Sequence, residues 1–155
     1  MSSNPAEAAA TALGVPYKLL SHGPVSSVAE AAEAQGVEVR DLVKTLVVRR
    51  ADDDYVFVLV PGDRSISWPK LRALLGVNRM SMPDAAVAKA VTGYERGTIT
   101  PFGSTTALPV VADATVTGRL ISLGAGAHGV AVTAQADEVV RVLDAQVADV
   151  TEPTA

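Results

Sequence analysis

The feature that most constrains the fold is an apolar stretch from Leu42 to Val48 that carries a single charge, Lys44. The stretch is rich in valine and leucine and therefore predicts a buried β-strand. Side chains alternate along a strand, so Lys44 shares a face with Leu46 and Val48, and this face is predicted to be a core or a pocket wall. An unpaired ammonium is costly there, so the lysine must pair, extend to an edge or meet an anionic ligand. A strand-end lysine whose head reaches water is the alternative.

Composition limits the classes of protein that fit this chain. With 155 residues and 48% hydrophobic content, residues 1–155 are predicted to form one domain. Aromatic residues make up only 4%, which argues against stacking of nucleic-acid bases on an aromatic platform. The absence of cysteine excludes disulfides, thiolate metal sites and a cysteine nucleophile. Two histidines do not favour zinc, and Asp52 to Asp54 are interpreted as a solvated hairpin turn, so we expect no metal and no cofactor.

Charge and hydropathy predict where the protein works and what it contacts. The formal net charge of -4 argues against unspecific coating of phosphate backbones, so any nucleic-acid contact should be local. The N-terminus lacks the basic and apolar regions of a secretory signal. No apolar run approaches the roughly 18 residues of a membrane span. We therefore expect a soluble, cytoplasmic protein without a membrane partner.

Turn residues divide the chain into short helices and strands without an internal repeat. Helices are predicted over 5–13, from the capping box that starts at Ser27 to Gly36, and over 68–75, 83–91 and 138–143. Strands are predicted over 17–20, 43–50, 55–60, 108–112, 119–123 and 130–133, with Met80 and Met82 as core positions of a further short strand. Many strands and few long helices favour a mixed α+β fold, a curved or barrel-like β-sheet flanked by short helices.

The segment Gly124 to Gly129 spells the dinucleotide fingerprint G-x-G-x-x-G, but its context argues against that function. A true fingerprint opens a helix that receives pyrophosphate, whereas the residues from Gly129 to Thr133 are typical of another strand. The segment is therefore interpreted as a strand-to-strand loop whose amides can face a carbonyl or a phosphate. His128 in this loop is either a hydrogen-bonding partner for a ligand or an exposed side chain without a role.

The sequence offers no pair of nucleophile and base. Serines are plentiful, but neither His22 nor His128 has a spacing that ties it to one of them. An enzyme with this sequence would work through positioning and electrostatics rather than through a covalent intermediate.

Short motifs follow one another along the chain in a characteristic order. They are Ser21-His22-Gly23-Pro24, Val43-Lys44-Thr45-Leu46-Val47, Pro61-Gly62-Asp63-Arg64, Lys70-Leu71, Leu75-Gly76, Thr92-Gly93-Tyr94, Gly97 to Gly103, Leu108 to Asp113 and Gly126 to Gly129. Each motif is weak alone, but the ordered set resembles the YbaK/ProX family of aminoacyl-tRNA editing domains, and the resemblance runs from Val15 to Val150.

The resemblance implies a trans-acting hydrolase that removes a wrong amino acid from transfer RNA. Alanine or cysteine on proline tRNA leads the list of substrates, followed by serine and threonine esters. Lys44 matches the functional lysine that engages the 3′-terminal nucleotide. A G-x-x-x-P loop that approaches the aminoacyl group is matched by Gly97, Thr98, Ile99, Thr100 and Pro101. The glycine-containing loop on the other side of the pocket is matched by Gly126, Ala127, His128 and Gly129.

The expected chemistry needs little from the protein, because an aminoacyl ester is already activated. We expect Lys44 to hold the terminal phosphate or ribose and amides of the two loops to stabilise the oxyanion. The chain departs from the family pattern at two places: Ser104 to Thr106 stand where some members carry lysines, and Ala131 stands where some carry an acidic residue. The alternatives are a non-catalytic module that binds aminoacyl-tRNA or a nucleotide, and a subunit that works docked to an aminoacyl-tRNA synthetase.

Overall fold

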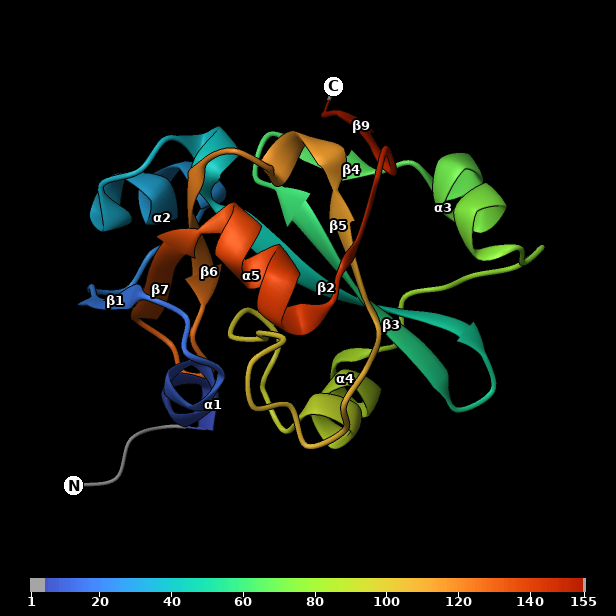
Figure 1. Ribbon diagram of the computed structural model, residues 1–155, viewed down its shortest axis with the longest axis horizontal. Coiled ribbons are helices and arrows are strands. Elements are labelled where there is room, and N and C mark those ends of the chain that lie inside the picture. Colours follow the sequence, from blue (N-terminus) through green and yellow to red (C-terminus); the bar gives the residue numbers. More distant parts are fainter. Residues whose placement is uncertain (1–4, 155) are drawn as a thin grey trace.

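The computed structural model describes residues 5–154, which form three β-sheets and five α-helices (Figure 1). The first sheet is antiparallel, in the order β1-β7-β6. Its strands are β1 (Tyr17–Ser21), β6 (Leu120–Gly124) and β7 (Val130–Gln135). The second sheet has the order β2-β3-β5-β8. Its strands are β2 (Val43–Ala51), β3 (Asp54–Pro61), β5 (Val110–Asp113) and β8 (Gln146–Ala148).

The second sheet is mixed, because β2 and β3 form an antiparallel hairpin whereas β5 and β8 add in parallel. A third, two-stranded sheet joins β4 (Arg64–Ile66) to β9 (Thr151–Pro153) near the C-terminus. One bridge, between Leu42 and Ser122, links the start of β2 to β6. The predicted mixed α+β class is confirmed, and the described residues do not close into a barrel.

The helices lie around the sheets, with α5 in front of the two larger sheets and α4 below β2 and β3 in the view of Figure 1. They are α1 (Pro5–Leu13), α2 (Val28–Gln35), α3 (Trp68–Leu75), α4 (Ala85–Thr92) and α5 (Ala136–Leu143). Half of the predicted capping box at the start of α2 is present, because the Ser27 side chain accepts a hydrogen bond from the Glu30 amide. The Glu30 carboxylate accepts from the Ser26 amide rather than from that of Ser27. Two short 3-10 helices, Val39–Asp41 and Ala114–Val116, precede β2 and follow β5.

Two hydrophobic clusters lie on opposite faces of the β2–β3 hairpin. Phe57 and Leu59 of β3 belong to the larger cluster, which the α5 residue Val139 joins. The alternate β3 residues, from Val56 to Val60, belong to the second cluster with Leu71 of α3. Both faces of β3 are therefore buried, which explains its continuous apolar sequence. In β2, Val43 and Val47 belong to the larger cluster and Val48 to the second, so Lys44 faces the second cluster.

The structure corrects several predicted elements. Met80 and Met82 do not form a strand; only Ser81 between them makes an isolated bridge, to Arg49, and Met82 is 43% exposed. The helix predicted from Pro83 begins at Ala85, because the Asp84 side chain caps it. The strands β4, β8 and β9 were not predicted, since each has three residues and too little pattern to identify.

Candidate functional site

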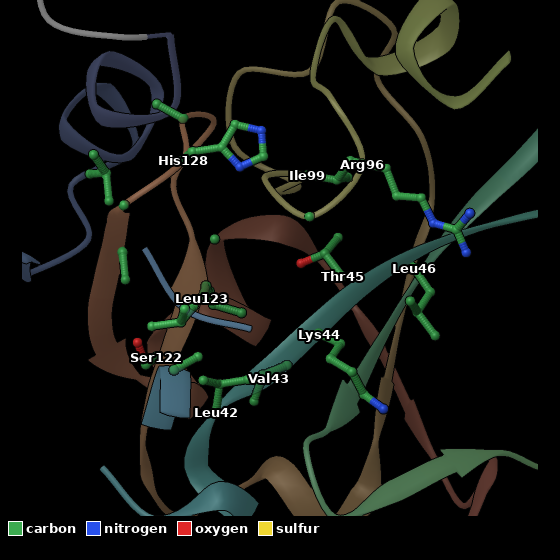
Figure 2. Close-up of a pocket in the computed structure, with 18 of the residues that line it drawn as sticks. Leu42, Val43, Lys44, Thr45, Leu46, Arg96, Ile99, Ser122, Leu123 and His128 are labelled. Atoms are coloured by element: carbon green, nitrogen blue, oxygen red, sulfur yellow. The ribbon is translucent and has the colours of Figure 1, made fainter. Parts of the chain in front are cut away.

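A cavity of about 400 Å³ opens beside the first half of β2 (Figure 2). Its walls are β2, α2, α4 with the loop that follows it, and the facing ends of β6 and β7 with their connection. Six of the ten predicted site residues line it: Lys44, Gly97, Ile99, Ala127, His128 and Gly129. The other four, Thr98, Thr100, Pro101 and Gly126, are not among the lining residues. The two predicted loops thus meet at one cavity with β2.

The two faces of β2 contribute differently to this cavity. Thr45 lies on the face of Val43 and Val47, is 9% exposed, and its hydroxyl oxygen has no hydrogen-bond partner among residues 5–154. Figure 2 shows the Thr45 side chain facing the loop that carries Ile99. Leu46 and Lys44 lie on the opposite face of the strand and line the cavity from there. The cavity therefore wraps around the edge of β2 rather than covering one face.

Lys44 is half-buried, and its amine is held by the fold. The Lys44 Nζ donates a 3.0 Å hydrogen bond to the main-chain oxygen of Arg64 in β4. Burial lowers the pKa of Lys44, and the nearby carboxylate of Asp63 acts in the opposite direction. In Figure 2 the Lys44 side chain extends away from Ile99 and His128. The structure thus brings the two loops together and leaves the Lys44 amine apart from them, at another end of the cavity.

The loop from Gly97 to Pro101 is held by its own polar groups. The Thr98 hydroxyl donates a 2.7 Å hydrogen bond to the main-chain oxygen of Glu95, and the Thr98 amide donates to the same oxygen at 2.9 Å. The Thr98 oxygen in turn accepts from the Gly126 amide at 2.9 Å. Thr98, Thr100 and Pro101 are buried, so they shape the loop and position Gly97 and Ile99 at the cavity.

The second loop requires glycine at two positions. Gly126 has φ +85°, and a Cβ there would lie 2.7 Å from the Tyr94 ring. A Cβ on Gly129 would lie 2.7 Å from the His22 oxygen, and the His22 amide donates to the Gly129 oxygen at 2.8 Å. The residues that follow form β7, as predicted, and not the helix of a dinucleotide site.

An exposed hydrogen bond connects the two loops. The His128 Nε2 lies 3.2 Å from a Glu95 carboxylate oxygen, and Lys89 of α4 lies 3.6 Å from the other oxygen. The hydrogen bond with His128 and the charge of Lys89 lower the pKa of Glu95. His128 therefore has a defined partner across the mouth of the cavity.

The sequence analysis missed a half-buried chain of hydrogen-bonded side chains on the cavity wall. The Ser122 hydroxyl donates to the side-chain oxygen of Gln35, and the Gln35 amide nitrogen lies 3.4 Å from the His22 Nε2. The His22 Nδ1 lies 2.9 Å from the Gly23 oxygen, which can only accept, so Nδ1 carries the proton and Nε2 accepts from Gln35. Because the Ser122 proton goes to an amide oxygen, this chain is not a nucleophile–base pair.

Arg96 is a second lining residue that sequence reasoning missed. It is exposed and lines the cavity together with Leu46. Arg96 brings a cation to the cavity, whereas the hydroxyls of Ser104 and Thr105 donate to the main-chain oxygens of Thr106 and Val91. The candidate site therefore has two cationic side chains, Lys44 and Arg96.

The carboxylates near the β2–β3 turn are paired with arginines rather than gathered at a metal site. Arg49 binds Asp52 at 3.0 Å and Arg50 binds Asp54 at 2.9 Å. Residues 5–154 contain no group of three or more histidine, aspartate or glutamate side chains placed to hold a metal ion. In the same residues, no helix is long and apolar enough to cross a membrane.

Comparison with known proteins identifies the family of this chain. Residues 22–142 match the model of the aminoacyl-tRNA editing domain. Proline–tRNA ligase from Thermosipho africanus is 36% identical over 80 residues, 52% of this chain and 14% of the ligase. Proline–tRNA ligase from Geobacter metallireducens is 36% identical over 92 residues, 59% of this chain and 16% of the ligase. The chain thus spans only a small part of the length of these curated relatives.

Solved structures agree with the sequence comparisons. A candidate trans-editing enzyme for prolyl-tRNA synthetase superposes with a TM-score of 0.88 at 26% identity, covering 97% of this chain and 99% of that one. The hypothetical protein APE2540 superposes with a TM-score of 0.89 at 28% identity, covering 96% of this chain and 100% of that one. The match over residues 22–142 includes β2, both loops and the whole cavity wall. The chain belongs to the aminoacyl-tRNA editing domain family.

Proposed function

We propose that this chain hydrolyses the ester bond of mischarged aminoacyl-tRNA, with alanine or cysteine on proline tRNA as the first substrates to test. The observation that carries the proposal is the cavity of about 400 Å³ in which β2 faces the loops around Gly97 and Gly126. Apolar side chains such as Leu42, Ile99 and Leu123 line much of it, which suits a small amino-acid side chain. Family membership supports the reaction class.

In this proposal the two cationic side chains, Lys44 and Arg96, bind the nucleotide end of the substrate. A lysine ammonium has three donors, and Lys44 uses one of them on the Arg64 oxygen, which leaves two for a phosphate or a ribose hydroxyl. Arg96 adds a second positive group at the cavity mouth. Local positive charge in a protein of net charge -4 suits recognition of one RNA end rather than of a long backbone.

In this proposal the loop amides donate hydrogen bonds to the oxygen of the reacting ester. The Gly126 amide is occupied by the Thr98 oxygen, so it is not available to a developing oxyanion. The amides of Gly97, Ala127 and His128 have no hydrogen-bond partner in the part of the chain that is described, and these three residues line the cavity. One preorganised donor of this kind is typically worth about 3 to 4 kcal/mol to the transition state. Water then attacks the ester directly, without a covalent intermediate on the protein.

We propose action in trans on the acceptor end of the tRNA, in the cytoplasm, with a synthetase as a docking partner. The match to 99% of a candidate trans-editing enzyme for prolyl-tRNA synthetase supports action in trans. The similarity to part of proline–tRNA ligases supports a functional connection to prolyl-tRNA synthesis.

A second candidate function is binding of aminoacyl-tRNA or a nucleotide without turnover. The position of the Lys44 amine favours it, because this amine is bonded to Arg64 and points away from the loops in Figure 2. A binding module predicts a measurable complex with mischarged tRNA that leaves the ester intact.

Deacylation of a panel of mischarged tRNAs separates the two functions. The purified chain is incubated with alanyl-, cysteinyl-, seryl- and prolyl-tRNA of the proline type, and the remaining ester is quantified over time. We expect faster loss of at least one mischarged ester than of prolyl-tRNA. Lys44→Ala should abolish this loss while the circular dichroism spectrum is kept, and Lys18→Ala, at an exposed position on β1, should behave as the wild type. Full activity in Lys44→Ala would refute the assigned role.

A further inference from the structure

The edge of β2 has no strand partner along the cavity, and the two residues Thr45 and Val47 on this edge are 9% and 2% exposed. β2 is the outermost strand of its sheet, and two isolated bridges hold its free edge, Leu42 to Ser122 at one end and Arg49 to Ser81 at the other. Between these bridges no strand of the described residues pairs with the edge, and the cavity lies there instead. An unpaired strand edge presents a row of main-chain donors and acceptors.

The hydrogen bonds of Arg49 show which main-chain groups face this space. The Arg49 amide donates to the Ser81 oxygen at 2.8 Å, and the Ser81 amide donates back to the Arg49 oxygen at 3.1 Å. The main-chain groups of Arg49 therefore point away from β3. Successive residues of a strand alternate, and the pairing of β2 with β3 has no register shift between Val43 and Arg49. The amide and carbonyl of Thr45 and of Val47 thus point away from β3 as well.

An independent contact in β3 agrees with this direction. Phe57 is the register partner of Val47, and its amide donates to the Pro109 oxygen at 2.9 Å, on the side of β5. Phe57 and Val47 therefore turn their main-chain groups away from each other, as a non-hydrogen-bonded antiparallel pair does. Val48, the next residue of β2, has the opposite direction and belongs to the ladder with β3.

The Thr45 side chain adds a second polar group at the same place. Its hydroxyl is buried without a partner among residues 5–154, although Thr45 lines the cavity. A buried hydroxyl without a protein partner beside a cavity is free to bond a water molecule or a ligand that displaces it. By contrast, the buried hydroxyl of Thr92 has a partner, the Ala88 oxygen at 2.8 Å.

We propose that the amino-acid part of the substrate binds as one added residue on the unpaired edge of β2, opposite Thr45 and Val47. This inference rests on the proposed function and names the subsite for the aminoacyl group. The substrate α-ammonium donates to a carbonyl of this edge, and the Thr45 hydroxyl completes the contact. The acyl oxygen accepts from the Val47 amide in addition to the loop amides that stabilise the developing oxyanion. Ser81 already pairs with Arg49 in this manner on the same edge. The main-chain groups of β2 thus recognise the α-ammonium and the acyl oxygen of the substrate, and the apolar cavity walls select a small side chain.

Binding of non-hydrolysable analogues tests the subsite independently of turnover. The probes are 3′-alanylamino-3′-deoxyadenosine and its 3′-propionylamino counterpart, which lacks the α-amino group. Isothermal titration should show at least about tenfold weaker binding of the propionyl probe, because one hydrogen bond of a charged group is lost. Equal affinities for the two probes would overturn the proposed ammonium contact and with it the inference.

An amide-to-ester replacement tests the main chain directly. Val47 is exchanged for its α-hydroxy acid, which removes one donor, and the alanyl probe should then bind about tenfold more weakly. The same exchange at Val48 is the matched control: it removes a ladder donor, so it should lower the melting temperature and leave the affinity of the folded protein unchanged. Unchanged affinity in the Val47 ester, or an equal loss in both esters, would contradict the subsite.

Side-chain variants of Thr45 complete the test. Thr45→Val should keep or raise the melting temperature, because it removes a buried hydroxyl without a protein partner. The same variant should bind the alanyl probe more weakly, and Thr45→Ser should restore the affinity. Thr92→Val is the control and should lower the melting temperature. A Thr45→Val protein that binds and deacylates as the wild type overturns the inference and leaves the proposed function standing. A wild type that binds neither probe and deacylates nothing overturns both.

Discussion

The Lys44 ammonium and the main-chain oxygen of Arg64 are joined by a 3.0 Å hydrogen bond. This bond ties the cavity to β4, and β4 pairs with β9 at the C-terminal end of the described chain. Arg64 itself donates to the Thr151 side chain at 2.6 Å. The lysine expected to hold the substrate is therefore positioned by the small β4–β9 sheet, which lies outside every predicted element.

The first prediction concerns the alkaline stability of the fold. Burial lowers the pKa of Lys44 from its ordinary value of 10.5, so folding disfavours its charged form. The unfolded chain binds more protons between the folded and unfolded pKa values, and the free energy of unfolding should rise with pH as the pH approaches 10.5. Urea denaturation of the wild type and of Lys44→Met should show this rise in the wild type alone. Parallel pH profiles would contradict the account.

The second prediction concerns Asp113, a fully buried carboxylate at the end of β5. Burial acts to raise its pKa, but hydrogen bonds from Thr115 and from the Val150 amide outweigh it and lower the pKa below 3.8. Asp113→Asn turns an amide group toward these donors and should cost about 1 to 3 kcal/mol of unfolding free energy at pH 7.

The contribution of Asp113 should fade in acid. A carboxylate with a lowered folded pKa stabilises the fold above its unfolded pKa, and the stabilisation is lost as the pH falls through the folded value. The difference in stability between wild type and Asp113→Asn should therefore shrink below pH 3.8. A difference that stays constant from pH 7 into this range would show that the charge of Asp113 is not the cause.

The third prediction concerns the bond between Ser122 and Gln35 on the cavity wall. Gln35→Leu leaves the buried Ser122 hydroxyl without its acceptor and should cost about 1 to 3 kcal/mol of stability. Adding Ser122→Ala removes the unpaired hydroxyl and should recover part of this loss, which a double-mutant cycle measures as a coupling energy. Strictly additive losses would mean that the two side chains do not interact.

The fourth prediction concerns the link between the two loops. The hydrogen bond with His128 and the charge of Lys89 hold the pKa of Glu95 below its usual value of 4.5. Carboxyl carbon NMR titration should find this lowered pKa in the wild type and a value closer to 4.5 in His128→Ala. The melting temperature should change little, because the pair is exposed. An unaltered Glu95 titration in the variant would place His128 elsewhere in solution.

Local signals in the sequence were sufficient for the elements around the site. The run from Val43 to Arg50, the polar turn after it and the run from Tyr55 predicted the β2–β3 hairpin, and the order of motifs predicted which two loops meet at the cavity. Alternation along β2 also predicted correctly that Lys44 would lie on the face of Leu46 and Val48.

Contacts between distant parts of the chain were not predictable in this way. The Gln35–Ser122 bond spans 87 residues, and so does the bond from Arg64 to Thr151. The hydrogen-bond partner of Lys44 is a main-chain oxygen, and every residue has one, so the amino-acid sequence does not identify it. The three-residue strands β4, β8 and β9 form because longer strands and loops bring them together, so their own sequences are not informative.

Deacylation of alanyl- and cysteinyl-tRNA of the proline type by the purified chain is the most direct measurement of the central claim. The account predicts time-dependent loss of at least one of these esters at catalytic protein concentration, with prolyl-tRNA spared and activity lost in Lys44→Ala. Formation of a stable complex with intact mischarged tRNA, or ester loss that Lys44→Ala leaves unchanged, would contradict it.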